Sequence, residues 1–212
     1  MKKIILLLCF FLSVSTLSFG QMYYKKCWFA EAGFGLGIQH YQFTDITNNQ
    51  TDPRDTSAAY EVPFRFEYAA LNWFGVSLDG NFASYITANS SKNESAKGID
   101  FVPTANIHAP FKMNHLDLSG TLGYGYSHFS YKVNDVNGGK AVANGWVLNW
   151  GINLRFLFKR DGHFGMGLWY KHSLYNYNKG TINDNAGNKT SFKLDGPGNN
   201  FGVGFFYRMP GL

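Results

Sequence analysis

Serine and histidine side chains stand next to each other at two places in the sequence. The first pair is Ser127-His128, and the second is His172-Ser173, which follows Lys171. A Ser–His pair can supply the nucleophile and the base of an acyl hydrolase. Both pairs lie in segments that alternate like β-strands, and adjacent side chains of a strand point to opposite faces. Neither pair can form a dyad, so we expect no catalytic residues and no enzyme.

The other polar motifs favour neither a metal site nor a cofactor. His108 and His115 are separated by a predicted turn and have no nearby Cys or carboxylate at ligand spacing. The stretch GFGLG at 33–37 is a glycine-lined strand face rather than a phosphate loop, because no helix follows it. The segment 45–55, DITNNQTDPRD, lacks the terminal Glu of a calcium-binding EF-hand. We expect no metal, no cofactor and no nucleic-acid partner.

Charged side chains inside apolar segments are the remaining candidates for a polar site. In YEVPFRFEY, residues 60–68, the even positions are apolar or aromatic, while Glu61, Arg65 and Glu67 lie on the other face. The complete set of such residues is Glu31, Glu61, Arg65, Glu67, Asp79, Asp100, Asp117, Arg155, Lys171 and Arg208.

The elements that would position these charges are eight segments with a period of two. They cover residues 28–43, 60–68, 73–85, 99–111, 116–128, 145–158, 163–175 and 200–209. Most are long enough for a tilted strand to cross a bilayer, which takes roughly 9–11 residues. Short connectors at 69–72, 112–115 and 159–162 alternate with long polar ones at 44–56, 87–98, 132–144 and 178–199. This rhythm predicts an all-β fold, an eight-stranded antiparallel up-and-down transmembrane β-barrel.

A soluble lipocalin-like barrel would show the same alternation with its faces reversed. The polar faces here carry mainly Gly, Ser, Asn and Ala, which suit a narrow filled lumen better than a wet exterior. Only 16% of the residues are charged and 18% are aromatic, against roughly 25% charged in a typical soluble domain. Trp and Tyr gather near segment ends, as in membrane interfaces. We therefore predict that the apolar face meets lipid.

The first residues predict export. Residues 1–20 form a signal peptide, with Lys2 and Lys3 before the apolar run IILLLCFFL, and residues 21–212 form one barrel domain. Loss of the two lysines changes the formal charge from +5 to +3, which favours no particular partner. Cys9 lies inside the apolar run, so Cys27 is the one mature thiol. It is a reactive group, an intermolecular bridge or, as we favour, an inert residue.

The strand and loop rhythm, the signal and the aromatic last strand FGVGFFYRM resemble the secreted eight-stranded outer-membrane barrels of the OmpA/OmpX type, the outer membrane protein beta-barrel domain family of Gram-negative bacteria. The resemblance implies location in the cell outer membrane and contact with outer-membrane lipid and lipopolysaccharide. The ending MPGL departs from the family, whose barrels usually finish on an aromatic residue. Pro63 and Pro103 lie inside strands, where each predicts a bulge or local break.

Eight strands leave an interior just wide enough for side chains, so the inward charges should pair within a structural plug rather than a conduit. We expect Glu31, Glu67 and Arg208 to meet across the closing seam. Arg65 should approach Asp79, and Arg155 should approach Asp117. Lys171 should reach Asp100 or another acid.

The leading functional hypothesis is a non-enzymatic, monomeric barrel with a structural or surface-interaction role, which displays its long loops to an extracellular ligand or host surface. Positions at the loop bases are candidates for contact with glycan or lipopolysaccharide phosphates: Tyr131, Lys132, Tyr175, Tyr177 and Lys179. The alternatives are a narrow transport pore, an accessory barrel of a secretion system (PorT-like) and a lipid A-modifying enzyme, for which the deacylase pattern His-x-Ser-Asn is absent.

Overall fold

The computed structural model describes residues 22–86, 94–109, 115–133, 139–159, 162–184 and 187–210. The predicted signal peptide and parts of the predicted turns at 112–115 and 159–162 lie outside these ranges. The strands are β1 (Trp28–Asp45), β2 (Gln50–Thr51), β3 (Asp55–Ala69), β4 (Phe74–Tyr85), β5 (Glu94–His108), β6 (Leu116–Val133), β7 (Lys140–Leu157), β8 (Phe164–Asn183) and β9 (Lys189–Met209). No helix in the described ranges has the length and hydropathy needed to cross a bilayer.

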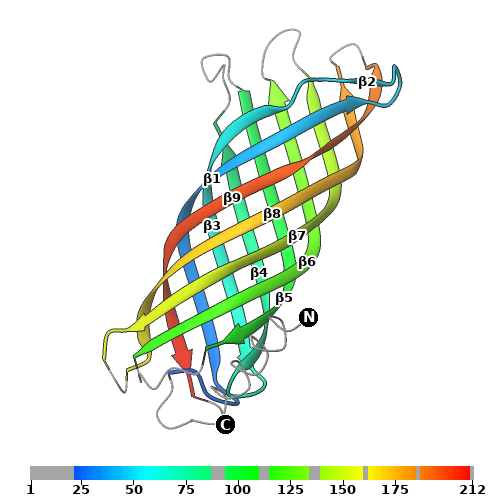
Figure 1. The fold of residues 1–212 in the computed structure, drawn as a ribbon. Helices are drawn as coiled ribbons and strands as arrows, with labels where there is room; N and C mark the ends of the chain where they lie inside the picture. The colour runs from blue at the N-terminus through cyan, green and yellow to red at the C-terminus, as the bar shows by residue number, and fades with distance from the viewer. Residues whose placement is uncertain are drawn as a thin grey trace.

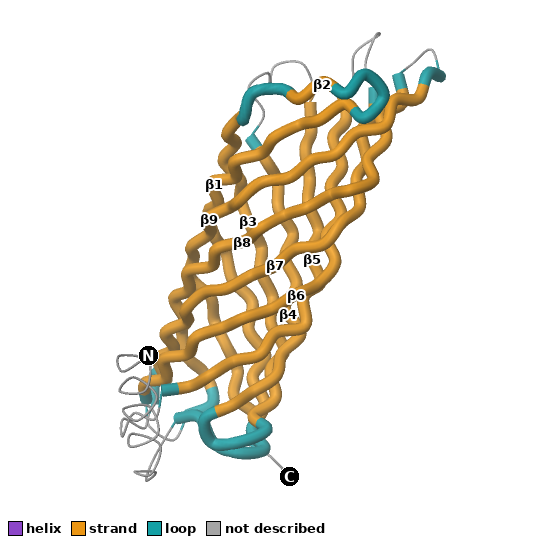
Figure 2. The backbone as a smooth tube through the Cα atoms, turned by 45° about the vertical axis from the view of Figure 1, so that its right-hand side comes forward, coloured by secondary structure: helices purple, strands orange, loops and turns teal. Residues whose placement is uncertain are grey.

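The strands form one closed antiparallel sheet (Figures 1 and 2). Each long strand pairs with its sequence neighbour, and β1 pairs with β9 from Trp28↔Met209 to Asp45↔Phe192, which closes the ring. The two-residue β2 pairs only with the last residues of β1. The barrel therefore has eight long strands, and the predicted fold class is confirmed.

Two ends of the barrel are distinguished by their connections. β1 begins and β9 ends at one end, which also carries the short turns, and in small outer-membrane barrels this is the periplasmic end. The other end carries β2 and the connections between β4 and β5, β6 and β7, and β8 and β9. We call it the outer end.

The strands run further toward the outer end than the alternation predicts. β8 extends to Asn183 and β9 starts at Lys189, so the predicted loop 178–199 is wrong over most of its length. β5 and β7 likewise start at Glu94 and Lys140, inside predicted loops. The reason is that a barrel wall beyond the membrane faces water on its outside, so an apolar outward face is not required there. The β-sheet of the barrel therefore continues beyond the membrane, over much of the sequence that was predicted as long loops.

The outward face carries the apolar side chains, as predicted. Along β6 the exposed outward residues include Leu122 and Tyr124, whereas Ser119 and Ser127 on the inward face are buried. Exposed aromatic and aliphatic side chains surround the barrel on the other strands too, among them Trp28, Phe82, Ile107, Ile152 and Phe205. A belt of this extent is stable only against hydrocarbon, so this is a transmembrane barrel.

The two prolines interrupt pairing without changing the strand register. β1 pairs with β3 at Ala32↔Phe64 and again at Gly35↔Glu61, and the two pairs between them, at Pro63, are missing. The same gap occurs around Pro103 between Phe101↔Tyr126 and Thr104↔Gly123. Each proline lacks the N–H that the ladder needs, so the predicted local break is present. The register shifts of the sheet lie elsewhere, at Asn144/Trp146 and Tyr177/Gly180.

Inward glycines make room for large inward side chains. A Cβ at Gly35 or Gly202 would come within about 2.5 Å of the Trp169 indole, and one at Gly180 would meet the Phe192 ring. The lumen is thus filled by a few bulky residues seated against bare backbone on neighbouring strands. This explains why the polar face of the sequence is rich in glycine.

Candidate functional site: the barrel interior and its outer cavity

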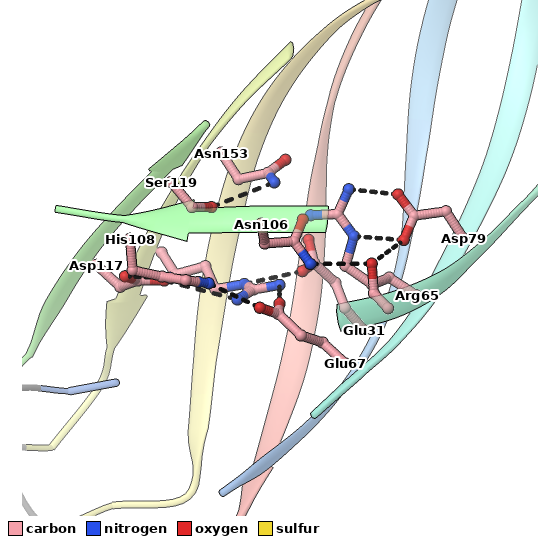
Figure 3. Close-up of polar contacts among 11 residues, drawn as sticks. Glu31, Arg65, Glu67, Asp79, Asn106, His108, Asp117, Ser119 and Asn153 are labelled. Atoms are coloured by element: carbon pink, nitrogen blue, oxygen red, sulfur yellow. Dashed lines mark hydrogen bonds and ion pairs between the residues drawn. The ribbon is translucent and has the colours of Figure 1, made fainter. Parts of the chain in front are cut away.

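A charge cluster around Arg155 of β7 lies in the lower part of the lumen. Figure 3 shows its acidic members Glu31, Glu67 and Asp117 together with His108. The Arg155 Nη2 atom donates to Glu67 Oε2 at 2.8 Å, and its Nε donates to Glu31 Oε2 at 3.1 Å. Its Nη1 lies 3.6 Å from Asp117 Oδ2. The guanidinium also lies over the Phe29 ring, 4.8 Å from its centroid. Arg155 is fully buried, so these partners replace its hydration.

His108 of β5 completes this cluster, although sequence spacing offered no reason to include it. Its Nε2 lies 2.7 Å from Glu67 Oε1, and its Nδ1 lies 2.8 Å from Asp117 Oδ1. Carboxylates only accept hydrogen bonds, so the two contacts suit a ring that donates from both nitrogens. The arrangement links β3, β5 and β6 across the lumen. Its one sequence signal is the position of His108 on the inward face of an alternating strand.

The predicted cluster of Glu31, Glu67 and Arg208 is wrong in its cation. Arg155 joins the two glutamates, while the Arg208 guanidinium donates to the backbone oxygens of Met22 at 3.0 Å and Gly162 at 2.9 Å. Arg208 is the residue before the last one of β9, and its guanidinium reaches the segment before β1 and the connection between β7 and β8 instead. The expected contact of Arg155 with Asp117 is present but is the longest of the three.

The segment before β1 closes the periplasmic mouth. Tyr23 stacks on His108 with ring centroids 3.4 Å apart, and Met22 and Cys27 are fully buried beside it. Cys27 is a free thiol, and burial raises its pKa to about 11. A buried thiol with a raised pKa is poorly nucleophilic, which favours the interpretation of Cys27 as an inert residue.

A second polar layer lies above the first one. The Arg65 guanidinium donates two hydrogen bonds to the Asp79 carboxylate, from Nε at 2.9 Å and Nη2 at 2.6 Å, so the expected pair is present. Ser77 donates to Asp79, and Asn106 donates to Ser77 (Figure 3). The layer joins β3, β4 and β5 through one hydrogen-bonded chain.

A third layer contains the remaining predicted charges. Glu61 is fully buried, and within the described residues its carboxylate oxygens have no hydrogen-bond partner. Lys171 forms no ion pair within 4 Å in the described part of the chain. Its ammonium lies 5.9 Å from the Trp169 ring centroid, and its charge acts at longer range on Glu61 and Asp100. The predicted contact of Lys171 with Asp100 or another acid is therefore wrong.

Asp100 is held by hydroxyl groups rather than by a cation. Ser127 Oγ donates to Asp100 Oδ1 at 2.5 Å, and the Tyr175 hydroxyl donates to Oδ2 at 3.1 Å. The Tyr177 hydroxyl lies 2.7 Å from Ser127 Oγ. Tyr175 and Tyr177 point inward, so the prediction that they stand at loop bases and meet surface glycan is wrong.

Above this layer the barrel opens into a cavity of about 500 Å³ at its outer end. Its walls come from the outer parts of all eight long strands and include the rings of Tyr41, Phe43, Tyr85, Phe129, Tyr131, Tyr175, Tyr177 and Phe192. Neighbouring rings contact one another, with Phe43 and Phe192 at 5.1 Å and Tyr85 and Phe129 at 5.7 Å between centroids. Sequence reasoning missed this cavity because about half of its wall, including Ala141, Phe192 and Leu194, lies in segments that were predicted as loops.

The Ser–His pairs do not form dyads. Ser127 faces inward to Asp100, while the His128 Nδ1 atom lies 2.7 Å from Asn144 Oδ1 on the outward side. Ser173 is fully buried in the lumen, and His172 Nδ1 lies 2.8 Å from Asn199 Oδ1. No group of three or more His, Cys, Asp or Glu side chains placed to hold a metal ion occurs among the described residues.

Solved structures with this fold are outer-membrane proteins. OprG from Pseudomonas aeruginosa is 15% identical and superimposes with a TM-score of 0.62, over 89% of this chain and 99% of OprG. A major outer membrane protein from Thermus thermophilus is 13% identical, with a TM-score of 0.55 over 85% and 99% of the two chains. The outer membrane protease OmpT from Escherichia coli is 8% identical, with a TM-score of 0.52 over 92% and 100%.

At these identities the likeness shows the fold alone, and that fold is the one predicted, a small outer-membrane β-barrel. Comparison with protein-family models finds no match, and comparison with curated proteins finds none either.

Proposed function

We propose that this chain is a non-enzymatic outer-membrane barrel that captures small molecules at its outer end. The observation that carries the proposal is the contrast between the two halves of the lumen. The outer half holds a cavity of about 500 Å³, within the range of about 300–1,000 Å³ that is usual for small-molecule sites. The half below it is filled by side chains.

The filling of the lower half argues against an open pore. The Arg65–Asp79 layer, the Arg155 cluster and the segment at 22–27 lie one below another between the cavity and the periplasmic end. Each polar layer is cross-linked by hydrogen bonds or ion pairs between strands, which makes it costly to displace. The capture function therefore needs no flow through the barrel.

The placement of the Ser and His side chains supports the non-enzymatic part of the proposal. Ser127 and Ser173 are buried in the lumen, and the neighbouring histidines are on the opposite face of their strands. OmpT shares the fold and is a protease by its description, so the fold alone does not decide the question. The positions of these side chains do favour a binding protein.

Equilibrium dialysis tests the proposal. The barrel in a neutral detergent is dialysed against cationic, neutral and anionic aromatic compounds, with empty micelles of the same detergent as the reference. We expect retention of at least one class above the reference. The variant Ala141→Trp, which fills part of the cavity from its wall, should lose that retention while keeping the folded barrel's resistance to denaturation by sodium dodecyl sulfate.

Two outcomes oppose the proposal. Equal retention by empty micelles shows that the barrel contributes nothing. Steady single-channel conductance of the unmodified barrel in planar bilayers shows that the lumen is open and favours transport instead.

A further inference from the structure

Three tyrosine hydroxyls of the outer cavity wall already donate their protons to protein acceptors, which leaves their oxygens as hydrogen-bond acceptors. Tyr41 donates its hydroxyl proton to Asp55 Oδ2 at 3.1 Å, and Tyr175 donates its proton to Asp100. Ser127 has a single hydroxyl proton, which it gives to Asp100. Tyr177 must therefore donate to Ser127, because a hydroxyl that has already given its proton can only accept.

Tyr131 lies near the Glu94 carboxylate, whose negative charge acts on its hydroxyl group. Hydrogen bonds to protein acceptors are formed by the hydroxyls of Tyr41, Tyr175 and Tyr177. The hydroxyl oxygens of these three tyrosines keep lone pairs that can accept a hydrogen bond. A ligand that supplies N–H groups also finds acceptors in the Asp55 and Glu94 carboxylates, which line the cavity.

The charges around the cavity have one sign. Asp55, Glu94 and Asp195 line it, and the described lining contains no lysine or arginine. The lysines of the outer end lie on the opposite face of the same wall, where they are exposed: Lys97, Lys132, Lys140, Lys179, Lys189 and Lys193. On β9, exposed Lys193 stands between Phe192 and Leu194, which are buried and line the cavity. This sorting makes the interior negative and attracts cations.

The body of the ligand meets aromatic and aliphatic carbon. Phe129 contacts the rings of Tyr85 and Tyr177, at 5.7 Å and 6.1 Å between centroids, and Tyr175 stacks on Tyr177 at 5.9 Å. Aromatic faces attract ammonium groups as well as apolar surface, most strongly where water is excluded. The wall thus combines two features that favour the same ligand.

We propose that the cavity binds an organic ammonium ion with an aromatic or apolar body. This inference rests on the proposed capture function and names its ligand class. The ammonium is held by Asp55 and Glu94, with the Tyr41 hydroxyl oxygen beside Asp55, while the body packs against the aromatic wall. The volume is sufficient for a molecule of two or three rings.

Isothermal titration with three matched compounds tests the ligand class. Tryptamine carries the ammonium, indole-3-acetamide is neutral, and indole-3-propionate is anionic, while all three share the indole ring. Titrated into the barrel in neutral detergent, tryptamine should bind saturably with one site. We expect the neutral and anionic compounds to bind at least about tenfold more weakly, since a hydrogen bond to a charged group is stronger than one between neutral groups.

Two variants of acidic residues in the cavity wall, which we call the rim variants, test whether these side chains hold the ammonium. Asp55→Asn and Glu94→Gln lie on exposed or half-buried wall positions, so the barrel should fold, and each should weaken tryptamine binding several-fold. Asp52→Asn is the matched control, because Asp52 is an exposed acid near the same end but is not part of the cavity wall. It should leave the affinity unchanged.

The outcomes separate this inference from the proposed function. Equal binding of all three compounds, abolished by Ala141→Trp, overturns the cation preference and keeps the capture function. Binding of none of them, with no other compound retained in dialysis, overturns both. An equal loss in Asp52→Asn and in the rim variants shows a general charge effect and overturns the site.

Discussion

Replacing Arg155 by methionine tests whether the lower charge cluster holds the barrel together. Methionine retains most of the aliphatic contact with Phe29 and leaves only a small void. The carboxylates of Glu67, Glu31 and Asp117, which are buried or nearly so, lose their shared cation. Removing one partner of a buried ion pair costs about 3–5 kcal/mol, and we expect a loss of that size in the free energy of unfolding.

The assay is reversible denaturant unfolding in phospholipid vesicles, followed by tryptophan fluorescence. Arg65→Met should cost less, about 1.5–3 kcal/mol, because Arg65 has one acidic partner and its side chain is 14% exposed. Arg54→Met, at an exposed position outside any strand, should change the free energy by less than about 0.5 kcal/mol. The order Arg155, Arg65, Arg54 follows from burial and from the number of partners.

A double-variant cycle identifies the cause of the loss. Combined with Glu67→Gln, Arg155→Met should cost less than the sum of the two single changes, because the carboxylate that needs the cation is gone. Arg155→Lys, which keeps the charge, should fold if the methionine variant does not. A cost below about 1 kcal/mol for Arg155→Met, the range of exposed pairs, refutes the view that this cluster stabilises the barrel.

Two further predictions concern the outer face and the periplasmic mouth. Leu122→Arg places a charge at a lipid-facing position that is 58% exposed, and it should lower the free energy of unfolding in vesicles by about 2–4 kcal/mol. The control Leu122→Met should have little effect. Equal free energies of unfolding for the two variants would contradict the assignment of Leu122 to the lipid-facing surface. Burial raises the pKa of Cys27 to about 11, so the thiolate fraction of Cys27 at pH 8 is lower than that of an ordinary thiol. Cys27 should therefore react slowly with a thiol-specific disulfide reagent in the folded barrel and quickly in denaturant. Fast reaction of the folded barrel would contradict the burial of Cys27.

The membrane part of the fold could be predicted because each side chain that faces the lipid must be apolar and each charged side chain must face the lumen. Tyr60, Val62 and Phe66 had to face outward, and Glu61 had to face inward, since a shift of one residue would place Glu61 and Arg65 in hydrocarbon. The pairing of Arg65 with Asp79 followed from the same count along two adjacent strands. Sequence spacing was therefore sufficient to predict which side chains face the lipid and which charges pair on adjacent strands.

The part of the barrel wall beyond the membrane could not be predicted, because its outer face meets water and need not be apolar. On β9 the apolar residues Phe192 and Leu194 face inward and Lys193 faces outward, the reverse of the membrane part. On β8 the register shift at Tyr177/Gly180 changes which residues face inward, so no single period continues along the strand. The reversed alternation on β9 and the register shift on β8 both hide the strand pattern in the sequence, although these parts of the strands form the cavity wall.

The sequence by itself determined which face of each membrane strand meets lipid, how many strands close the barrel and which charges lie inside it, because burial in hydrocarbon depends only on a residue and its neighbours along the strand. Only the tertiary structure decided which charges meet, since Arg155 reaches Glu31 and Glu67 across the lumen from strands far apart in the chain. It also decided that Tyr41, Tyr175 and Phe192 surround one cavity. Contacts across a lumen depend on the tilt and stagger of the closed sheet, which no single strand encodes.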